Sequence, residues 1–376
     1  MAQIDLDLAH AYAPHPQQDS DYALLPLKMT FKDGGAYALL GPSGCGKTTM
    51  LNVISGLLPP SQGQVLFDGR DVTALSPQAR NIAQVFQFPV IYDTMTVAEN
   101  LAFPLKNRGV APDKIRARVG KIAEMLEMSA QLNQRAAGLT ADAKQKISLG
   151  RGLVREDVSA VLFDEPLTVI DPQLKWQLRR KLKQIHHELK LTLIYVTHDQ
   201  VEALTFAEQI VVMSRGRAVQ MGSAEALFER PQHMFVGNFI GSPGMNFLRG
   251  ESTGGVATVA GHALAGPLPA LPVFTLGVRP EYVALVAAGT PGALPATVAT
   301  VQDVGTYWLL SARIAVGAVG VGGNGAADAP AVKLRLPAQA KPPSVGEAVW
   351  LRLLGEHTCF YGPDEQLIPS SEAAPR

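Results

Sequence analysis

A glycine-rich segment near residue 45 has the residue types that bind phosphate. It matches the pattern G-x-x-x-x-G-K-[ST]. Its residues are Gly41, Pro42, Ser43, Gly44, Cys45, Gly46, Lys47, Thr48 and Thr49. Glycines let backbone N–H groups close around phosphate oxygens, Lys47 can reach the β- and γ-phosphates, and Thr48 offers a hydroxyl to Mg²⁺. The segment therefore predicts a site for a nucleoside triphosphate and Mg²⁺.

A second group of chemically active residues lies further along the chain. Asp164 and Glu165 follow the apolar run Val161–Phe163, and His198 follows another apolar run. Downstream of a phosphate-binding loop, Asp164 is expected to hold Mg²⁺ through its water shell and Glu165 to accept a proton from the attacking water. An imidazole after a parallel strand can hydrogen-bond the γ-phosphate, so His198 completes a predicted hydrolytic site.

Short apolar runs that alternate with helical patterns must position these groups. The expected strands are 36–40, 83–86, 158–163, 192–196 and 210–213, all suited to a buried parallel sheet. Asp171-Pro172 opens a helix whose apolar face comprises Leu174, Leu178, Leu182, Ile185 and Leu189. Helical patterns at 97–101 and 119–128 interrupt the alternation. We therefore expect an α/β domain with an inserted helical subdomain at about 96–155.

The composition of the chain changes near residue 245. Downstream runs, such as 298–304, are rich in Gly, Pro, Ala and Val, and strands of three to seven residues are expected between turn formers. The segment 317–330 is expected to form an exposed hairpin tip. We predict two domains, 1–240 and 241–376, of which the second is a small all-β barrel or sandwich.

Composition excludes several classes of protein. The chain has 376 residues and 47% hydrophobic residues, which indicates a globular protein. Its 33 Lys+Arg balance 33 Asp+Glu, so the protein as a whole has no positive electrostatic field that would attract nucleic acid. Cys45 and Cys359 are the two cysteines, too few for a disulfide framework, which favours a reducing cytosol. Neither a signal peptide nor an apolar stretch of membrane-spanning length is expected, so a role at a membrane would require another chain.

Two further segments carry a resemblance to a known family. Val85-Phe86-Gln87, followed by Thr96-Val97-Ala98-Glu99-Asn100, and Leu167-Thr168-Val169-Ile170-Asp171 match segments of the ATP-binding subunits of ABC transporters. Together with the motifs above, they make the chain similar to the sugar-importer type of that family. The resemblance implies that ATP is hydrolysed with Mg²⁺, that Gln87 links the nucleotide and its metal to a membrane partner, that Asp171 lies in the D-loop, and that His198 is the switch histidine.

The resemblance also concerns both ends of the chain. Family members stack an aromatic residue near the N-terminus on adenine, which implies Tyr12, with Tyr22 as the second choice. The segments 235–243 and 277–281 resemble the entry to the regulatory domain of maltose-type and glycerol-phosphate-type ATPases. The second domain is therefore expected to be OB-like, of the TOBE type.

The chain departs from the family at the signature motif. Where the family has Leu-Ser-Gly-Gly-Gln, this chain has Leu139 followed by Thr140, Ala141, Asp142 and Ala143. Thr140 keeps a hydroxyl, but the Asp142 carboxylate would repel a triphosphate unless it turns away. Two readings stay open, in which Asp142 caps the following helix or weakens the site it offers to a partner.

The variant motif, taken with the resemblance, suggests an assembly. An intact nucleotide site beside a degenerate signature implies a heterodimer with a second, non-identical ABC ATPase, although a homodimer stays open. The implied partners are two transmembrane permeases and a periplasmic or extracellular substrate-binding protein, with this chain peripheral on the cytoplasmic face of the bacterial membrane. Glycerol is the favoured substrate, sn-glycerol-3-phosphate, a sugar or another polyol are alternatives, and a weakly hydrolysing nucleotide-sensing regulator is the rival function.

Overall fold

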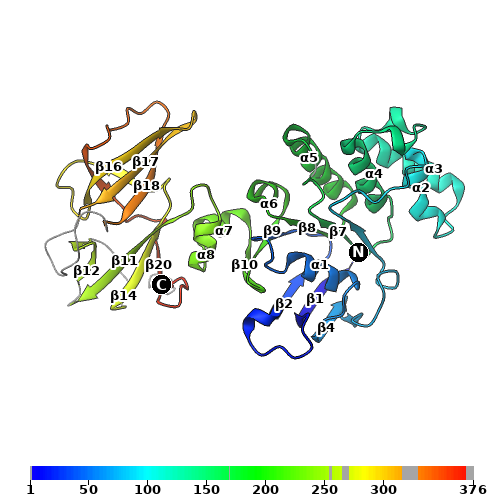
Figure 1. The fold of residues 1–376 in the computed structure, drawn as a ribbon, viewed down its shortest axis with the longest axis horizontal. Coiled ribbons are helices and arrows are strands. Elements are labelled where there is room, and N and C mark those ends of the chain that lie inside the picture. Colours follow the sequence, from blue (N-terminus) through cyan, green and yellow to red (C-terminus); the bar gives the residue numbers. More distant parts are fainter. Residues whose placement is uncertain (1, 169, 254–255, 265–270, 316–328, 370–376) are drawn as a thin grey trace, which may run out of the picture. The chain divides into compact units, whose positions relative to one another are not determined.

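The computed structural model describes residues 2–168, 170–253, 256–264, 271–315 and 329–369. The expected hairpin tip at 317–330 lies almost wholly outside these residues. The chain divides into two compact units, Met1–Ala224 and Glu225–Arg376. Figure 1 gives the labels of the elements, and each unit is described by itself.

The first unit is built on a six-stranded sheet with the strand order β10-β9-β3-β8-β7-β6. Its strands are β3 (Ala36–Leu40), β6 (Ile82–Val85), β7 (Ala160–Asp164), β8 (Leu193–Thr197), β9 (Gln209–Ser214) and β10 (Arg217–Gly222). All neighbours pair in parallel except β9 and β10. The parallel core confirms the predicted α/β class. The predicted strand 36–40 coincides with β3, and the other predicted strands differ from the observed ones by one or two residues at their ends.

A second, antiparallel sheet of the same unit was not predicted. It has the order β2-β1-β4-β5, formed by β1 (Ile4–Ala11), β2 (Tyr22–Phe31), β4 (Gln62–Phe67) and β5 (Arg70–Asp71). Ile4, Leu6 and Leu8 alternate with polar or smaller residues and are buried. This alternation is the signal of a strand with one buried face.

The helices of the first unit are α1 (Lys47–Ser55), α2 (Val97–Lys106), α3 (Pro112–Met125), α4 (Ala141–Leu153), α5 (Pro172–Leu189) and α6 (Gln200–Phe206). Of these, α1, α4 and α6 contact strands of the six-stranded sheet, whereas α2 and α3 pack with α4. Leu162 of β7 packs in the core that contains α1 and the antiparallel sheet, whereas Val161 and Phe163 pack with α4 and α5. Successive strand residues point to opposite faces, so β7 is buried on both sides.

The inserted helical subdomain consists of α2, α3 and α4, which pack against one another and group together in Figure 1. The helix predicted at 119–128 is corrected here, because α3 ends at Met125. Glu127 takes a left-handed φ of 57°, which stops a helix. The face predicted for α5 is confirmed, since Leu178, Leu182 and Ile185 are buried.

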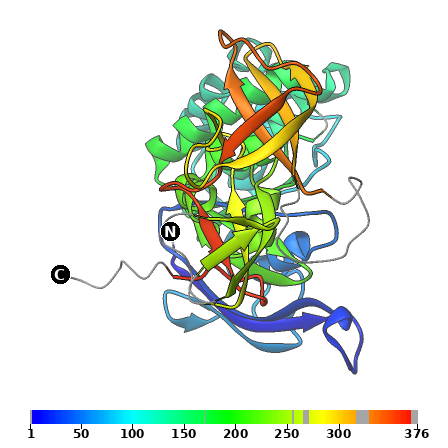
Figure 2. The same cartoon turned by 90° about the vertical axis from the view of Figure 1, so that its left-hand side faces the viewer.

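The second unit begins with two short helices and continues as all-β structure, which confirms the predicted β-rich second part. The helices are α7 (Ala224–Glu229) and α8 (Met234–Phe239). One antiparallel sheet has the order β13-β12-β11-β14-β20, with β11 (Asn246–Thr253), β12 (Val256–Val259), β13 (His262–Ala263), β14 (Val273–Val278) and β20 (Cys359–Tyr361). The other has the order β15-β19-β16-β17-β18, with β15 (Ala284–Val286), β16 (Leu294–Asp303), β17 (Tyr307–Ile314), β18 (Ala331–Pro337) and β19 (Ala348–Arg352). Figure 2 shows both sheets of this unit facing the viewer.

The two sheets of the second unit share one hydrophobic core, to which Leu248 and Phe274 contribute from the first sheet and Leu310 and Leu351 from the second. Several strands are longer than the three to seven residues predicted. The run at 298–303 belongs to β16, which has 10 residues and pairs with both β17 and β19.

The observed division between the units lies earlier in the chain than the predicted boundary at residue 240. The buried guanidinium of Arg279 explains the difference, because it donates hydrogen bonds to Leu227 O, Phe228 O and Ile240 O. These bonds tie α7 and the end of α8 to the β sheets. Within the described residues, no helix combines the length and hydropathy that a membrane span requires.

Candidate active site

The glycine-rich loop lies between β3 and α1, as predicted. Gly46 is the N-cap of α1 with a φ of 104°, and a Cβ at this position would lie 2.4 Å from Ala23 O, so only glycine fits. Gly41, Cys45 and Thr49 are buried, whereas Ser43, Gly44 and Thr48 are exposed. Burial raises the pKa of the Cys45 thiol. The exposed part of the loop can therefore meet a ligand while its remainder is held by packing.

Lys47 is the cation of this loop and is only 5% exposed. Its Nζ donates to Gly41 O at 2.9 Å and to Pro42 O at 3.0 Å, so the ammonium group closes the loop on itself. These carbonyls belong to the segment that is expected to surround phosphate. An incoming anion would therefore find the lysine already beside the loop.

The predicted Mg²⁺ ligands Thr48 and Asp164 come together at the sheet edge. Thr48 Oγ1 donates to Asp164 Oδ1 at 3.1 Å, although the two residues lie on α1 and β7. Burial raises the pKa of the Asp164 carboxyl above its ordinary value, and the bond from Thr48 partly opposes this rise. A hydroxyl beside a carboxylate is a hard oxygen donor set, which fits Mg²⁺.

Glu165 and His198, predicted as the catalytic pair, are also neighbours. His198 Nδ1 lies 3.0 Å from Glu165 Oε2, which accepts a further hydrogen bond from Thr168 Oγ1 at 3.2 Å. The backbone N–H of Glu165 donates to Val196 O, and its φ of 46° is left-handed. The chain thus turns after Asp164, and the two neighbouring carboxylates have different partners, Thr48 for Asp164 and His198 for Glu165.

Tyr12 and Tyr22, the first and second choices for an adenine contact, both lie near the phosphate-binding loop's end of the antiparallel sheet. Tyr12 is 69% exposed, and its hydroxyl lies 3.1 Å from Oγ1 of Thr49 in the first turn of α1. The ring also meets His10 edge to face, with centroids 4.9 Å apart. Tyr22 begins β2, opposite Ala11. Tyr12 therefore lies beside the phosphate-binding loop and is largely exposed.

Gln87 follows β6 and lies at the same edge of the sheet as the other groups. The loop, Gln87 and His198 follow β3, β6 and β8, and Asp164 ends β7; these strands are mutually parallel. Their carboxyl ends share one edge, where ligands of α/β proteins bind. Within the described part of the chain, the Gln87 side chain makes no hydrogen bond to Thr48 or Asp164.

The variant signature lies at the start of α4, and one of its two readings is corrected. Thr140, not Asp142, is the N-cap, because Thr140 Oγ1 accepts from Ala143 N at 3.3 Å. Asp142 lies in the first turn, and the described residues provide no hydrogen bond or ion pair for its carboxylate. Ala141 is exposed. The carboxylate is therefore not engaged as a cap.

Asp171 is the N-cap of α5, as its sequence Asp-Pro predicts, and its Oδ1 accepts from Gln173 N at 2.9 Å.

Sequence reasoning missed Glu202 of α6, which follows His198 by four residues in the chain and is buried. Asp199 and Glu202 have the spacing of a capping box, and this spacing is the signal that marks the position. In the structure Asp199 caps α6, but Glu202 turns inward instead.

Comparisons with known proteins agree with this geometry. Residues 24–168 match the family described as ABC transporter. The chain is 37% identical over 354 residues to the sn-glycerol-3-phosphate import ATP-binding protein UgpC of Paraburkholderia xenovorans (strain LB400), covering 91% of this chain and 93% of that protein. It is 39% identical over 337 residues to UgpC of Salmonella typhi, with 87% and 90% covered.

The chain is an ABC transporter ATPase. Its fold is similar to that of cbiO1 from Clostridium perfringens, described as part of the ABC transporter complex cbiONQ, with a TM-score of 0.55 and 26% identity. That similarity covers 61% of this chain and 90% of the other. The ABC ATPase therefore binds and hydrolyses ATP, as the sequence predicts.

Proposed function

We propose that this ABC ATPase powers import of a small polyol or its phosphate, with glycerol and sn-glycerol-3-phosphate as the two candidates. The observation that carries the proposal is the identity of about 40% over most of the chain to proteins named as sn-glycerol-3-phosphate import subunits. The variant signature favours glycerol, whereas the names of these relatives favour its phosphate.

We assign the steps of ATP hydrolysis to residues of one sheet edge. Lys47 exchanges its bonds to Gly41 O and Pro42 O for bonds to the β- and γ-phosphates. Thr48 and Asp164 hold Mg²⁺, which when bound neutralises the charge of the phosphate oxygens. Tyr12 stacks on adenine, and Gln87 extends from β6 toward the same site.

Glu165 and His198 handle the proton of the attacking water. Glu165 accepts this proton, and the carboxylate is kept in place by Thr168 and by His198. His198 is proposed to contact Glu165 through Nδ1 and the γ-phosphate through its other ring nitrogen. The imidazole therefore connects the proton acceptor to the phosphoryl group that is transferred.

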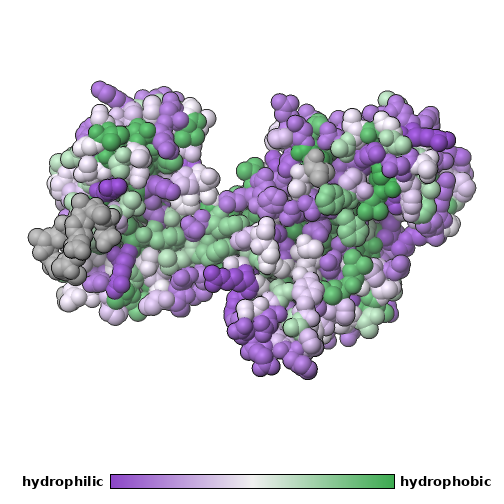
Figure 3. Space-filling model, viewed as in Figure 1, coloured by the Kyte–Doolittle hydropathy of each residue, from purple (hydrophilic) through white to green (hydrophobic). Residues whose placement is uncertain are grey.

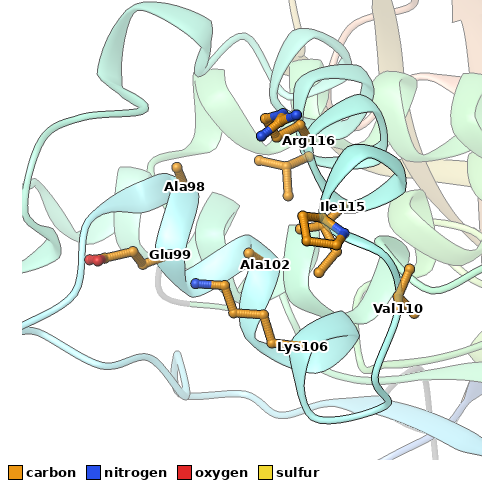
Figure 4. Close-up of a pocket in the computed structure, with 9 residues that line it drawn as sticks. Ala98, Glu99, Ala102, Lys106, Val110, Ile115 and Arg116 are labelled. Carbon is orange, nitrogen blue, oxygen red and sulfur yellow. The ribbon is translucent and has the colours of Figure 1, made fainter.

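A groove in the helical subdomain supports docking of a permease. A cavity of about 390 Å³ lies between α2 and α3. In Figure 4, Ala98, Ala102 and Ile115 line it, with the charged groups of Lys106 and Arg116 near its rim. An apolar floor with a charged rim fits a short amphipathic helix of a membrane partner.

Exposed apolar side chains beside Gln87 form a second candidate docking surface. Phe86, Phe88 and Val90 all reach solvent, and Phe88 is 69% exposed. Figure 3 shows hydrophobic residues on the surface of the first unit. Hydrophobic residues that gather on a protein surface mark interaction sites. We propose that two permeases contact the ATPase pair here, on the cytoplasmic face of the bacterial membrane, and receive substrate from a periplasmic or extracellular binding protein.

We propose that the second ATPase of the complex is a different chain. Asp142 would face the triphosphate held by the partner ATPase, and its carboxylate, which does not cap α4, would repel that anion. One composite site then uses this chain's intact loop, and the other uses its weak signature. The second unit, residues 241–376 in the predicted division, is proposed to be the regulatory, TOBE-type domain.

Affinity purification from solubilised membranes of the native cell tests the assembly. We expect two permeases and a second, different ABC ATPase to co-purify, and uptake of labelled glycerol or sn-glycerol-3-phosphate to identify the substrate. Recovery of permeases with this ATPase alone would exclude the heterodimer. Recovery of soluble partners alone would favour a nucleotide-sensing regulator.

The Glu165→Gln variant separates the importer from that regulator. In the importer it is expected to abolish uptake and to trap ATP, because no group then accepts the proton of water. A Glu188→Gln variant, at an exposed site on α5, is the matched control. Uptake that survives in the Glu165→Gln variant would contradict the importer function.

A further inference from the structure

The carboxylate of Glu202, four residues after His198 in the chain, is buried. Glu202 in α6 is only 4% exposed, although it carries an ionisable group. Its Oε2 accepts hydrogen bonds from Thr197 Oγ1 at 2.7 Å and from Tyr195 Oη at 3.1 Å. Both donors belong to β8, the strand that ends immediately before His198. A carboxylate is costly to bury, so these bonds must offset a considerable loss of hydration.

The bond to Thr197 restrains the backbone on both sides of His198. Thr197 Oγ1 donates to Glu202 and accepts from the backbone N–H of Asp199 at 3.0 Å. Asp199 in turn caps α6 by accepting from Val201 N at 2.7 Å. His198 is therefore held between two residues whose positions depend on the same carboxylate.

A cation from another element faces the same carboxylate. Lys175 Nζ lies 3.9 Å from Glu202 Oε1. Lys175 belongs to the first turn of α5, the helix that Asp171 caps, and its backbone N–H donates to Asp171 O. The pair therefore links the start of α5 to the loop that carries His198.

We infer that Glu202 is a positioning residue for His198 in ATP hydrolysis. Through Thr197 it holds the imidazole at the 3.0 Å separation from Glu165, and through Lys175 it makes that separation depend on the position of α5. The inference rests on the proposed role of His198 at the γ-phosphate. Glu202 itself touches neither of the reacting groups in this arrangement.

A double-mutant cycle in the assembled membrane complex tests the inference. Glu202→Gln keeps the size of the side chain and removes its charge. We expect kcat for ATP to fall on the order of 10-fold with little change in KM, because a small displacement of a catalytic group lowers the rate rather than the affinity. In a His198→Ala background the same change is expected to lower kcat less than about twofold, since its effect passes through His198.

A second variant and a control make the outcome decisive. Thr197→Val removes the hydroxyl but keeps the branched shape, and it is expected to lower kcat as Glu202→Gln does, without a further loss when both are combined. Glu188→Gln changes an exposed carboxylate on α5 and should leave kcat unaltered. Thermal unfolding of each variant checks that the fold is retained.

Each contrary result has its own meaning. Equal losses of kcat on Glu202→Gln with and without His198 would show a general structural role and overturn the inference, as would an unchanged kcat. If Glu202→Gln fails to fold, the Thr197→Val cycle decides in the same way. A normal kcat in His198→Ala alone would instead overturn the role of His198, and the inference with it.

Discussion

At the scale of single residues, the site is built from pairs that come from different elements. Thr48 meets Asp164, Glu165 meets His198 and Tyr12 meets Thr49, each within about hydrogen-bond distance. Each pair joins a loop or strand end to a neighbouring element. The chemistry therefore depends on the register of the sheet as much as on the residues themselves.

Tyr12 provides a prediction at this scale. Tyr12→Ala is expected to weaken ATP binding by roughly 1–3 kcal/mol, the usual contribution of stacking between an aromatic side chain and a base. Tyr12→Phe keeps the ring and loses the bond to Thr49, so most of the affinity should remain. Calorimetric titration with ATP measures both. Tyr22→Ala serves as the control, and a larger loss in that variant would reverse the assignment.

At the scale of secondary-structure elements, the start of α4 allows a test of which residue caps the helix. Thr140→Ala removes the N-cap and is expected to destabilise the chain by about 1 kcal/mol. Asp142→Asn removes a charge near the positive end of the helix dipole but no cap, so its cost should be about 0.3–1 kcal/mol. Denaturant unfolding of the two variants measures the difference. A greater loss for Asp142→Asn would show that its carboxylate acts as the cap after all.

The elements also show what the sequence could reveal. Strand β3 coincides with its predicted bounds, since a buried parallel strand is a continuous apolar run between a turn and a glycine-rich loop. The antiparallel strands β1 and β2 were missed although β1 alternates in polarity, because they hold no chemical motif. Glu202 was missed because its burial follows from packing against β8 and α5, which no local pattern encodes.

At the scale of the whole molecule, a cluster of partly exposed polar groups joins three segments of the second unit near α7. Tyr282 Oη donates to Glu229 Oε1 at 2.5 Å, and His357 stacks on the same tyrosine with ring centroids 4.0 Å apart. The other oxygen of Glu229 lies 2.6 Å from His357 Nδ1. Residues from α7, from the turn after β14 and from the loop before β20 thus share one cluster.

This cluster predicts how stability changes at alkaline pH. Burial, followed by the bond to Glu229, raises the pKa of Tyr282 to about 12. The folded state therefore retains a proton that the unfolded chain loses near pH 10, so the stabilisation is complete below pH 10 and lost as the pH rises toward 12. The midpoint temperature of thermal unfolding should fall less steeply from pH 9 to 12 for Tyr282→Phe than for the unaltered chain. An unchanged slope, matching that of Tyr12→Phe, would contradict this.

The closed glycine-rich loop has a consequence for the interval between catalytic cycles. Lys47 bonds to Gly41 O and Pro42 O, and Thr48 to Asp164, so the groups destined for the triphosphate already have partners within the chain. Loading and release of nucleotide are then exchanges of partners rather than the making and breaking of a pocket. The buried ammonium of Lys47 is thus compensated by carbonyls of its own loop, and its bonds to phosphate must outweigh these bonds.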